Sequence, residues 1–456
     1  MTFPRVVELD YQPNTVERFR AFSAEPWCVL LDSGRPGNRR GRYDIYSASP
    51  YLTLETCGEV TEISTRAESE FSYGEPLELL RDSLGEQAVQ QNDLPFSGGA
   101  IGYFSYDLGR RFERLPHLAQ RDIEMPDMAV GFYDWAVVVD HESRRTWLTG
   151  QGRDERTCDL WQEIVERVST PQDAPSQESF RVVSPVASNF DRAAYGDAFD
   201  RVQEHIRVGD CYQVNLAQRF SAEIRGDSWR AYESLRDLNP APFAAYLSTP
   251  AGDVLSSSPE RFLRVRGEQA ETRPIKGTRP RALSARRDDE LAEELRNSLK
   301  DRAENVMIVD LLRNDLGKSC APGTVVVDSI CEVESYANVH HLVSAVSGRL
   351  APNAHAVDLL RGCFPGGSIT GAPKVRAMEI IESLEPHRRG VYCGAIGYIG
   401  FDGAMDTNIA IRTLVRHGDR LYAWAGGGIV ADSDAEAEYQ ESLAKVETQL
   451  AIMKHG

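Results

Sequence analysis

The sequence predicts a chain that mixes helices and strands, with short strands prominent in its first part. Runs rich in β-branched and aromatic residues, which are typical of strands, occur at 27–33, 43–46 and 129–140. From residue 190, apolar residues also recur at helical spacing, beginning with Tyr195, Phe199, Val202 and Ile206. Hydrophobic residues make up 41% of the chain and charged residues 26%, which is the composition of a folded globular protein.

Composition also excludes several classes of protein. The formal net charge of -18 argues against a nucleic-acid partner or an anionic membrane surface. No apolar run reaches the ~18 residues of a membrane span, and the first residues lack the apolar core of a signal peptide. The eight cysteines are scattered without a Cys-x-x-Cys pair, so neither zinc nor a disulfide framework is expected. A reducing cytoplasm is the expected location.

Three regions are expected along the chain. Residues 1–150 form an N-terminal lobe of short strands with a helix at 76–84. Residues 151–189 form a linker region, because 169–177 is polar and carries two prolines. The strongly patterned remainder, 190–456, is expected to carry the chemistry.

The start of this last region predicts a helix followed by a strand. The helix through Tyr195 is expected to end at Gly209-Asp210. The segment 212–218 then alternates, with Tyr212, Val214 and Leu216 on one face and Gln213 and Asn215 on the other.

A hairpin is expected to bring a carboxylate close to a lysine. Gly267-Glu268 reads as the turn between strands at 254–265 and around Lys276. If residue 266 pairs with 269, Glu260 falls opposite Ile275 and within one residue of Lys276. Prolines at 259 and 274 interrupt the ladder, so the pattern predicts proximity and leaves the face open.

Two helices each carry a pair of acidic residues three positions apart. One helix is predicted from Asp288 to about Asn314, with Leu291, Leu295 and Leu299 packing inward and Asp301 and Glu304 on one face. The other follows a strand at 420–424 and the glycines 426–428, and it begins near Ser433 in a capping box with Glu436. Its buried stripe is expected to be Tyr439, Leu443, Val446 and Leu450, with Glu438, Glu441 and Lys445 on another face.

These acidic pairs have two interpretations. Facing helices bearing Asp301/Glu304 and Glu438/Glu441 would give an all-oxygen site suited to Mg²⁺. Acidic pairs on helices are, however, usually a solvated surface. Spacing alone does not decide between the two.

Single residues give further hypotheses. Lys276 lies in a Pro-Ile-Lys-Gly setting, and a desolvated lysine beside other cations becomes nucleophilic. Arg412 lies in an apolar strand, where a substrate carboxylate would be a suitable partner. His341 also lies in an apolar run, where a hydrogen-bonded core histidine is the ordinary outcome. The loop 365–374 lacks the ending of a nucleotide-binding P-loop; it and Gly426–Gly428 are either backbone cradles for a carboxylate or tight turns.

Taken together, several motifs resemble those of the chorismate-utilising enzymes, the family that contains anthranilate synthase component I, aminodeoxychorismate synthase component I, isochorismate synthase and salicylate synthase. The motifs are Pro274 to Thr278, Asp301 to Asn305 with Asp310, Pro365 to Lys374, Gly426 to Ser433 and Glu438 to Ser442. The resemblance implies an α+β fold: two large, mostly antiparallel β-sheets forming a sandwich, with helices outside and the active site in a cleft.

Two positions indicate a branch of the family. Anthranilate synthases carry alanine where this chain has Lys276, and the lysine is typical of aminodeoxychorismate synthase component I. Isochorismate and salicylate synthases use a lysine where this chain has Gln213, so activation of water is not expected. The resemblance therefore implies a transferase that converts chorismate and ammonia to 4-amino-4-deoxychorismate, for para-aminobenzoate and folate synthesis. The alternatives are an anthranilate synthase component I and a non-catalytic tryptophan-sensing protein.

The resemblance also implies a role for each site residue. Lys276 attacks the chorismate ring and forms a covalent adduct while Glu260 protonates the departing hydroxyl. Mg²⁺ is held by Glu304 and Glu441, with Asp301 and Glu438 acting through waters. The ring carboxylate is positioned by Gly426, Gly427, Thr370 and Lys445. Tyr398 and Arg412 bind the enolpyruvyl carboxylate, and His341 lies beside the ring.

Ammonia is expected from a separate glutamine amidotransferase subunit, forming a heterodimer, because no cysteine here has the Gly-x-Cys-x-Gly setting of a glutaminase. A separate aminodeoxychorismate lyase would complete para-aminobenzoate. The family's N-terminal lobe also often binds L-tryptophan. The matching positions here are Ser33, Arg40, Gly41, Arg42, Tyr43, Pro242, Phe243 and Ala244, and an ordinary strand-turn-strand is the alternative. Asp32 stands where anthranilate synthases have glutamate, which favours a structural tryptophan over feedback inhibition.

Overall fold

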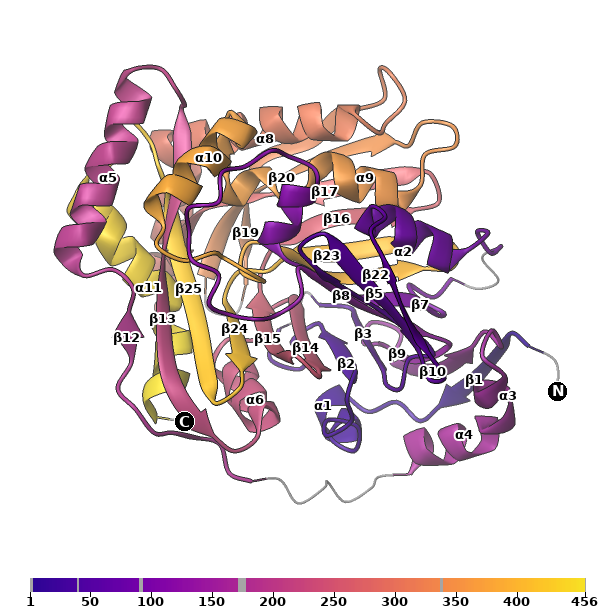
Figure 1. The fold of residues 1–456 in the computed structure, drawn as a ribbon. Coiled ribbons are helices and arrows are strands. Elements are labelled where there is room, and N and C mark those ends of the chain that lie inside the picture. The colour runs from indigo at the N-terminus through magenta and orange to yellow at the C-terminus, as the bar shows by residue number, and fades with distance from the viewer. Residues whose placement is uncertain (1–2, 39–40, 90–92, 171–177, 337–338, 456) are drawn as a thin grey trace.

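Two large β-sheets face each other in the computed structural model, which describes residues 3–38, 41–89, 93–170, 178–336 and 339–455 (Figure 1). The named strands pair antiparallel throughout both sheets. The expected sandwich of two mostly antiparallel sheets is therefore confirmed. No helix in the described ranges is long and apolar enough to cross a membrane.

The first sheet runs from the N-terminal strand to the long strand β13. Its strands, in spatial order, are β1 (Arg5–Leu9), β10 (Arg145–Gly150), β9 (Trp135–Asp140), β3 (Tyr43–Ser47), β2 (Val29–Asp32), β14 (Phe243–Thr249), β15 (Gly252–Ser258), β24 (Thr413–His417), β25 (Arg420–Ile429), β13 (Gln213–Arg225) and β11 (Arg181–Val182). Two short strands also pair with β13, namely β12 (Ala187–Ser188) and β21 (Gly371–Ala372).

The second sheet carries the lysine strand at one edge. Its strands are β18 (Ile275–Pro280), β20 (Val339–Arg349), β17 (Gln269–Arg273), β16 (Arg261–Arg266), β23 (Met405–Ile409), β22 (Ala395–Gly400), β7 (Gly99–Phe104), β8 (Met128–Tyr133), β4 (Leu52–Cys57), β5 (Val60–Thr65) and β6 (Ser69–Ser72), with β19 (Val326–Ser335) paired to β20.

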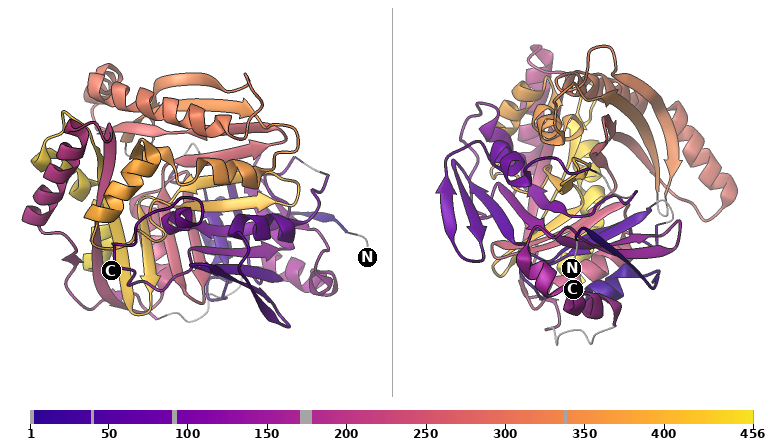
Figure 2. Two further views of the ribbon diagram at one scale, coloured as in Figure 1. Left: turned by 45° about the horizontal axis from the view of Figure 1, so that its top comes forward. Right: turned by 90° about the vertical axis from the view of Figure 1, so that its right-hand side faces the viewer.

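Helices cover the outer faces of the sandwich (Figures 1 and 2). Those against the first sheet are α1 (Thr15–Phe19), α4 (Trp161–Ser169), α6 (Ser228–Leu238) and α11 (Ala435–His455). Those against the second sheet are α7 (Ala285–Asn297) and α8 (Leu299–Gly317). The others are α2 (Pro76–Leu84), α3 (Glu155–Asp159), α5 (Arg192–Arg207), α9 (Ala356–Cys363), α10 (Lys374–Leu384) and the 3₁₀ turns η1 (Tyr106–Arg111) and η2 (Gly367–Ile369).

Strand β9 shows how the sequence builds these layers. Ala136 and Val138 point into the core between the two sheets. Trp135, Val137 and Val139 point into a second core beneath the helices of the first sheet. Successive side chains of a strand face opposite sides, so a continuous apolar run is needed where both faces are covered.

Both sheets combine strands from the first 150 residues with strands from the last 267. In the first sheet β2 pairs with β14, and in the second β7 pairs with β22. Residues 151–189 thus separate two parts of the sequence, but each sheet contains strands from both parts. Part of that region, 171–177, lies outside the described residues.

Two helix predictions need correction. The single helix predicted over 288–314 is two helices, because Ser298 is extended and its hydroxyl accepts a hydrogen bond from the N–H of Asp301 to begin α8. Leu299 therefore lies at a helix start and is 85% exposed rather than buried. The predicted capping box at Ser433 is also wrong: Asp434 accepts from the N–H of Ala437, and the Ser433 hydroxyl donates instead to Glu438.

The predicted hairpin is confirmed, with Arg266 paired to Gln269. A bulge between residues 261 and 264 shifts the register, and β18 leaves the hairpin to pair with β20. Glu260 and Ile275 nevertheless remain close, since the Ile275 N–H donates to Glu260 Oε1 at 3.4 Å.

A buried ion pair joins η2 to strand β13. Arg389 is 2% exposed and donates to both carboxylate oxygens of Glu385. It also donates to the carbonyls of Ile369 at 2.9 Å and Asn215 at 2.6 Å. The Glu385 carboxylate in turn accepts from the N–H of Ala217. One guanidinium therefore fixes the end of η2 against β13.

Replacing Arg389 by methionine is expected to destabilise the fold by about 3–5 kcal/mol, because it leaves the Glu385 carboxylate buried and unpaired. Chemical denaturation followed by circular dichroism measures this free energy of unfolding. The matched control is Arg207→Met, which removes an exposed Arg–Glu pair within α5 and should cost at most about 1 kcal/mol. Equal effects of the two substitutions would contradict the assigned role of Arg389.

Candidate active site and a second cavity

Lys276 lies on β18, half-buried, with its amine directed at the loop that holds η2. Its Nζ donates to the carbonyl oxygen of Ser368 at 3.0 Å. Burial lowers the pKa of Lys276, and the carboxylate of Glu304 opposes this effect only in part. A larger neutral fraction makes the amine a better nucleophile near neutral pH.

Glu260 is 4% exposed and lies beside this lysine. Burial raises the pKa of Glu260 to about 7, although the Ser368 hydroxyl and Lys276 both act to lower it. The nucleophile candidate thus contacts the Ser368 carbonyl, and the acid candidate accepts from the N–H of Ile275, the residue before Lys276. The proximity of Glu260 and Lys276 expected from the hairpin is present, and a carboxyl group of this pKa can donate a proton near neutral pH.

The loop around Ser368 was not singled out residue by residue in the sequence. Its end is anchored by Lys374, whose Nζ donates to Asp315 at 2.6 Å and to the Cys363 carbonyl at 2.7 Å. Ser368 could have been found only through its place in the motif 365–374, because its contacts are made across the fold. The likeness of the loop 365–374 to a phosphate-binding loop gave no information on where Ser368 lies in the fold.

The acidic residues of α8 and α11 lie among lysines. Lys300 Nζ is 3.4 Å from Glu438 Oε1, and Lys445 Nζ is 2.6 Å from Glu441 Oε1. Burial raises the pKa of Glu304, which Lys276 opposes. Glu438 is buried. Of the two interpretations of the acidic pairs, a solvated surface is therefore wrong for this residue. Within the described ranges, no three His, Cys, Asp or Glu side chains are grouped as a metal site.

Asp301 differs from the other three acidic residues. Its carboxylate lies 3.2 Å from Arg279 Nη2, on β18. Gly277 on the same strand has φ +78° and packs against Asp301, where a Cβ would lie 2.9 Å from the Asp301 side chain. The Pro-Ile-Lys-Gly setting is thus explained by contact with α8.

The glycines of β25 form the floor beneath the acidic residues. A Cβ on Gly427 would lie 2.9 Å from Glu438 Oε2 and 3.7 Å from both Glu441 Oε1 and Lys445 Nζ. Lys445 Nζ also donates to the Gly426 carbonyl at 3.1 Å. This strand needs glycine because the carboxylates approach its backbone.

Arg412 has a left-handed backbone, with φ +54°, and is half-buried. Its guanidinium donates to the Lys445 carbonyl, and none of the ion pairs among the described residues includes it. Burial lowers the pKa of Arg412, while Tyr392 and Glu441 act in the opposite direction. A buried guanidinium without a carboxylate partner is suited to binding an anion.

Tyr398 does not lie at this end, and the structure corrects its expected role. Its hydroxyl accepts from Arg266 Nη2 at 3.1 Å, and its ring packs on Phe96, at a different cavity. The tyrosine beside Arg412 is Tyr392, whose ring stacks on Trp424 with centroids 6.0 Å apart. Both tyrosines precede or lie within β22, so strand pattern alone could not separate them.

The remaining site residues are buried polar groups. His341 Nδ1 shares a hydrogen bond with Thr278 Oγ1 at 2.9 Å, and burial lowers the pKa of His341 to about 4, so the ring is neutral. The Thr370 hydroxyl donates to the Gly366 carbonyl. Gln213 is 0% exposed, and its side-chain nitrogen and oxygen have no protein partner. It faces Gly428, where a Cβ would lie 2.1 Å from Gln213 Nε2. An unpartnered buried amide needs a ligand or water.

A second cavity of about 420 Å³ lies between the sheets, away from Lys276. Seven of the eight positions expected at a tryptophan site line it: Ser33, Gly41, Arg42, Tyr43, Pro242, Phe243 and Ala244. The eighth, Arg40, lies outside the described residues. The cavity is also lined by Arg261 and Tyr398.

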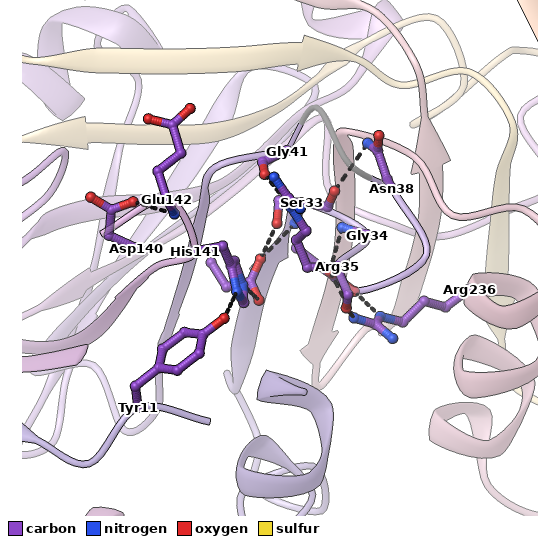
Figure 3. Close-up of polar contacts among 12 residues, drawn as sticks. Tyr11, Ser33, Gly34, Arg35, Asn38, Gly41, Asp140, His141, Glu142 and Arg236 are labelled. Atoms are coloured by element: carbon purple, nitrogen blue, oxygen red, sulfur yellow. Dashed lines mark hydrogen bonds and ion pairs between the residues drawn. The ribbon is translucent and has the colours of Figure 1, made fainter. Parts of the chain in front are cut away.

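The wall of this cavity is braced by buried hydrogen bonds (Figure 3). Both the N–H and hydroxyl of Ser33 donate to Asp44 Oδ1, while Asp44 Oδ2 contacts His141 Nε2 at 2.7 Å. The other ring nitrogen of His141 contacts the Tyr11 hydroxyl at 3.0 Å. Asp32 is paired with Arg236 at 2.5 Å, so its charge is already matched within the wall.

Comparisons with known proteins match almost the whole chain. A family model described as chorismate binding enzyme matches residues 28–451. Aminodeoxychorismate synthase component 1 of Salmonella typhimurium is 48% identical over 97% of each chain, and anthranilate synthase component 1 of Thermus thermophilus is 39% identical over 94% of this chain and 92% of its own. The crystal structure of anthranilate synthase component I from Streptococcus pneumoniae superposes with a TM-score of 0.80 at 31% identity, covering 91% of this chain and 93% of that one. This chain belongs to the family of chorismate-binding enzymes.

Proposed function

We propose that this chain is the chorismate-converting component of an aminodeoxychorismate synthase. The observation that carries the proposal is Lys276, which lies next to the residue whose N–H donates to the proton donor Glu260, and whose own amine is held by the Ser368 carbonyl. Relatives that share 48% identity over nearly the full length bear that name. An anthranilate synthase component is the rival, and Lys276 is the residue that argues against it.

The reaction is a substitution in two stages at the chorismate ring. The neutral amine of Lys276 bonds to ring carbon C2, the ring double bonds shift, and the C4 hydroxyl leaves as water with the proton of Glu260. Ammonia then bonds to C4, the double bonds shift back, and the Lys276 amine leaves C2. The product is 4-amino-4-deoxychorismate, and Lys276 is regenerated for the next cycle.

The substrate carries two carboxylates, and cationic groups at both ends suit them. Arg412, with Tyr392 in place of Tyr398, binds the enolpyruvyl carboxylate. Lys445, with the backbone of Gly426 and Gly427, faces the ring carboxylate. These local charges offset the repulsion that a chain of net charge -18 exerts on a dianion.

Mg²⁺ fits the oxygen donors of α8 and α11. Glu304 and Glu441 would hold it, with Asp301 and Glu438 supporting through waters, and it would supply positive charge at the ring carboxylate. The fit rests on the carboxylates that now lie against Lys300 and Lys445, because those lysines occupy the electrostatic role of a cation. Asp301 would need to leave Arg279 to take part.

Ammonia comes from a separate glutamine amidotransferase subunit in a heterodimer, and a separate lyase completes para-aminobenzoate. The name "component 1" borne by the relatives supports a partner component. The second cavity is proposed to hold L-tryptophan in a structural role, because seven expected positions line it and Asp32 is neutralised by Arg236.

The purified chain, given chorismate, Mg²⁺ and ammonium at alkaline pH, is expected to yield para-aminobenzoate once the lyase is added. Liquid chromatography measures the product. Fluorescent anthranilate, or chorismate recovered unchanged, would contradict the proposal.

Lys276→Ala is expected to lower the ammonia-dependent rate by at least about 100-fold, because it removes the group that bonds to the ring. Mass spectrometry of the unaltered chain given chorismate without ammonia should show an adduct on Lys276. The control is Lys454→Ala, at the exposed end of α11, which should retain the full rate. An active Lys276→Ala chain would rule out an essential nucleophile.

Glu304→Gln is expected to raise the Mg²⁺ concentration needed for half-maximal rate by about tenfold or more, because a ligand charge is lost. Titration of the rate with Mg²⁺ measures the change. Glu290→Gln, which alters an exposed carboxylate of α7, should leave the titration unaltered. A metal requirement insensitive to Glu304 would place the ion elsewhere.

L-tryptophan is expected to bind the second cavity, and Ala244→Leu should weaken this binding at least about tenfold by filling space at its wall. Calorimetry on the chain after denaturation and refolding, which removes any retained ligand, measures the affinity. Ala251→Leu, in the turn after β14, is the size-matched control. Undiminished binding in Ala244→Leu would show that tryptophan binds at another place.

A further inference from the structure

Arg412 lies where the chain crosses from one sheet to the other. Strand β23 ends at Ile409 in the second sheet, and β24 begins at Thr413 in the first. Arg412 makes this corner with φ +54°, in the left-handed region that residues other than glycine seldom adopt. Such a conformation persists only where the surrounding groups fix it. The direction of the Arg412 guanidinium therefore depends on the contacts that hold the corner.

Helix α11 holds this corner at two points one helical turn apart. The side-chain Nε2 of Gln449 donates to the Arg412 carbonyl oxygen at 3.0 Å. Four residues earlier in the helix, the carbonyl oxygen of Lys445 accepts from Arg412 Nη1. One further bond comes from β15, where the Ser257 N–H donates to the Arg412 carbonyl at 3.2 Å. Both the backbone and the side chain of Arg412 are thus bonded to α11.

Gln449 is a polar residue in apolar surroundings. It is 1% exposed, and Val446, Ile452 and Met453, which are three or four positions away on the same helix, belong to the core beneath the helices of the first sheet. Its side-chain oxygen Oε1 has no hydrogen-bond partner in the described part of the chain. A buried polar atom without a partner destabilises a fold, so an apolar side chain would suit this core better. The contact that an apolar side chain could not make is the one with the Arg412 carbonyl.

We propose that Gln449 is a positioning residue that fixes the corner at Arg412 and thereby directs its guanidinium toward the enolpyruvyl carboxylate of chorismate. This inference rests on the proposed function, in which Arg412 binds that carboxylate. The carboxylate takes no part in the bond changes at C2 and C4, so it is bound equally in the ground state and the transition state. Loss of such an interaction raises KM and leaves kcat unchanged.

The test substitutes Gln449→Met, which keeps the length of the side chain and removes both its donor and its unpartnered oxygen. Rates at saturating ammonium, coupled to the lyase, give kcat and KM for chorismate. KM is expected to rise about 3- to 10-fold, the effect of one hydrogen bond, with kcat altered by less than about twofold. The variant should unfold at the same temperature as the unaltered chain or a higher one, because the unpartnered oxygen is gone.

The matched control is Gln151→Met in the N-terminal lobe. Gln151 Nε2 also donates to a backbone carbonyl, that of Ser97, at 2.8 Å. The control therefore removes the same kind of bond away from the corner, and it should leave KM unaltered.

A double-mutant cycle with Arg412 separates this role from general packing. Arg412→Ala alone should lower kcat/KM about 10- to 100-fold, because the carboxylate loses a charged partner. In that background Gln449→Met should alter kcat/KM by less than about 1.5-fold, since no guanidinium remains to be directed; independent effects would instead multiply. If Arg412→Ala is too slow to measure, Arg412→Lys replaces it, because lysine lacks the planar fork, and the effect of Gln449→Met should there fall to less than about half.

An unchanged KM in Gln449→Met would overturn the inference. An effect of equal size with and without Arg412 would also overturn it, because Gln449 would then act through packing alone. If Gln449→Met does not fold, Gln449→Asn, whose shorter amide cannot reach the Arg412 carbonyl, is tested by the same two criteria. An unchanged kcat/KM in Arg412→Ala would remove Arg412 from the carboxylate site and this inference with it. Chorismate left unconverted by the unaltered chain would overturn the proposed function as a whole.

Discussion

The ion pair between Arg389 and Glu385 determines where the chemistry can take place. Arg389 donates to carbonyls on β13 and on η2, and Glu385 accepts from a β13 N–H. Neither segment could satisfy these buried backbone groups alone. Because η2 carries Ser368, the pair also fixes the carbonyl that accepts from Lys276. A buried ion pair is weak evidence for stability by itself; here its effect is to set geometry across three segments far apart in sequence.

A second constraint is electrostatic. Three carboxylates from α8 and α11, those of Glu304, Glu438 and Glu441, lie among lysines, while Asp301 pairs with Arg279. Like charges brought this close in a desolvated region are tolerated only with counter-charges between them. The same lysines would face a bound dianion. The lysines therefore counter the charge of the carboxylates when the site is empty and the charge of the substrate when it is occupied.

The sequence predicted the features that depend on local pattern or on several motifs at once. The hairpin at Gly267-Glu268, the strands at 129–140 and the sandwich were confirmed. The break at Ser298 was missed, because helical periodicity continues through it and only the Ser298 hydroxyl, which accepts from the Asp301 N–H, marks the start of a second helix. Tyr398 was assigned to the wrong end because two tyrosines six residues apart cannot be placed by pattern. Ser368 was missed because its contact with Lys276 is tertiary.

The candidate active site and the cavity between the sheets are adjacent along β16, and this limits what a ligand in the cavity can do. Glu260 belongs to the site, while the next residue, Arg261, lines the second cavity and pairs with Asp406 and Glu271. Arg42 is paired with Asp140, and Asp32 with Arg236. With these charges matched inside the wall, the cavity suits a ligand of little net charge, such as a zwitterionic amino acid. Such a ligand can alter activity only if it binds two states of the chain with different affinity. Arg261 of β16 pairs with Asn408 of β23, and both residues line the cavity, so a ligand there would complete the core between the sheets.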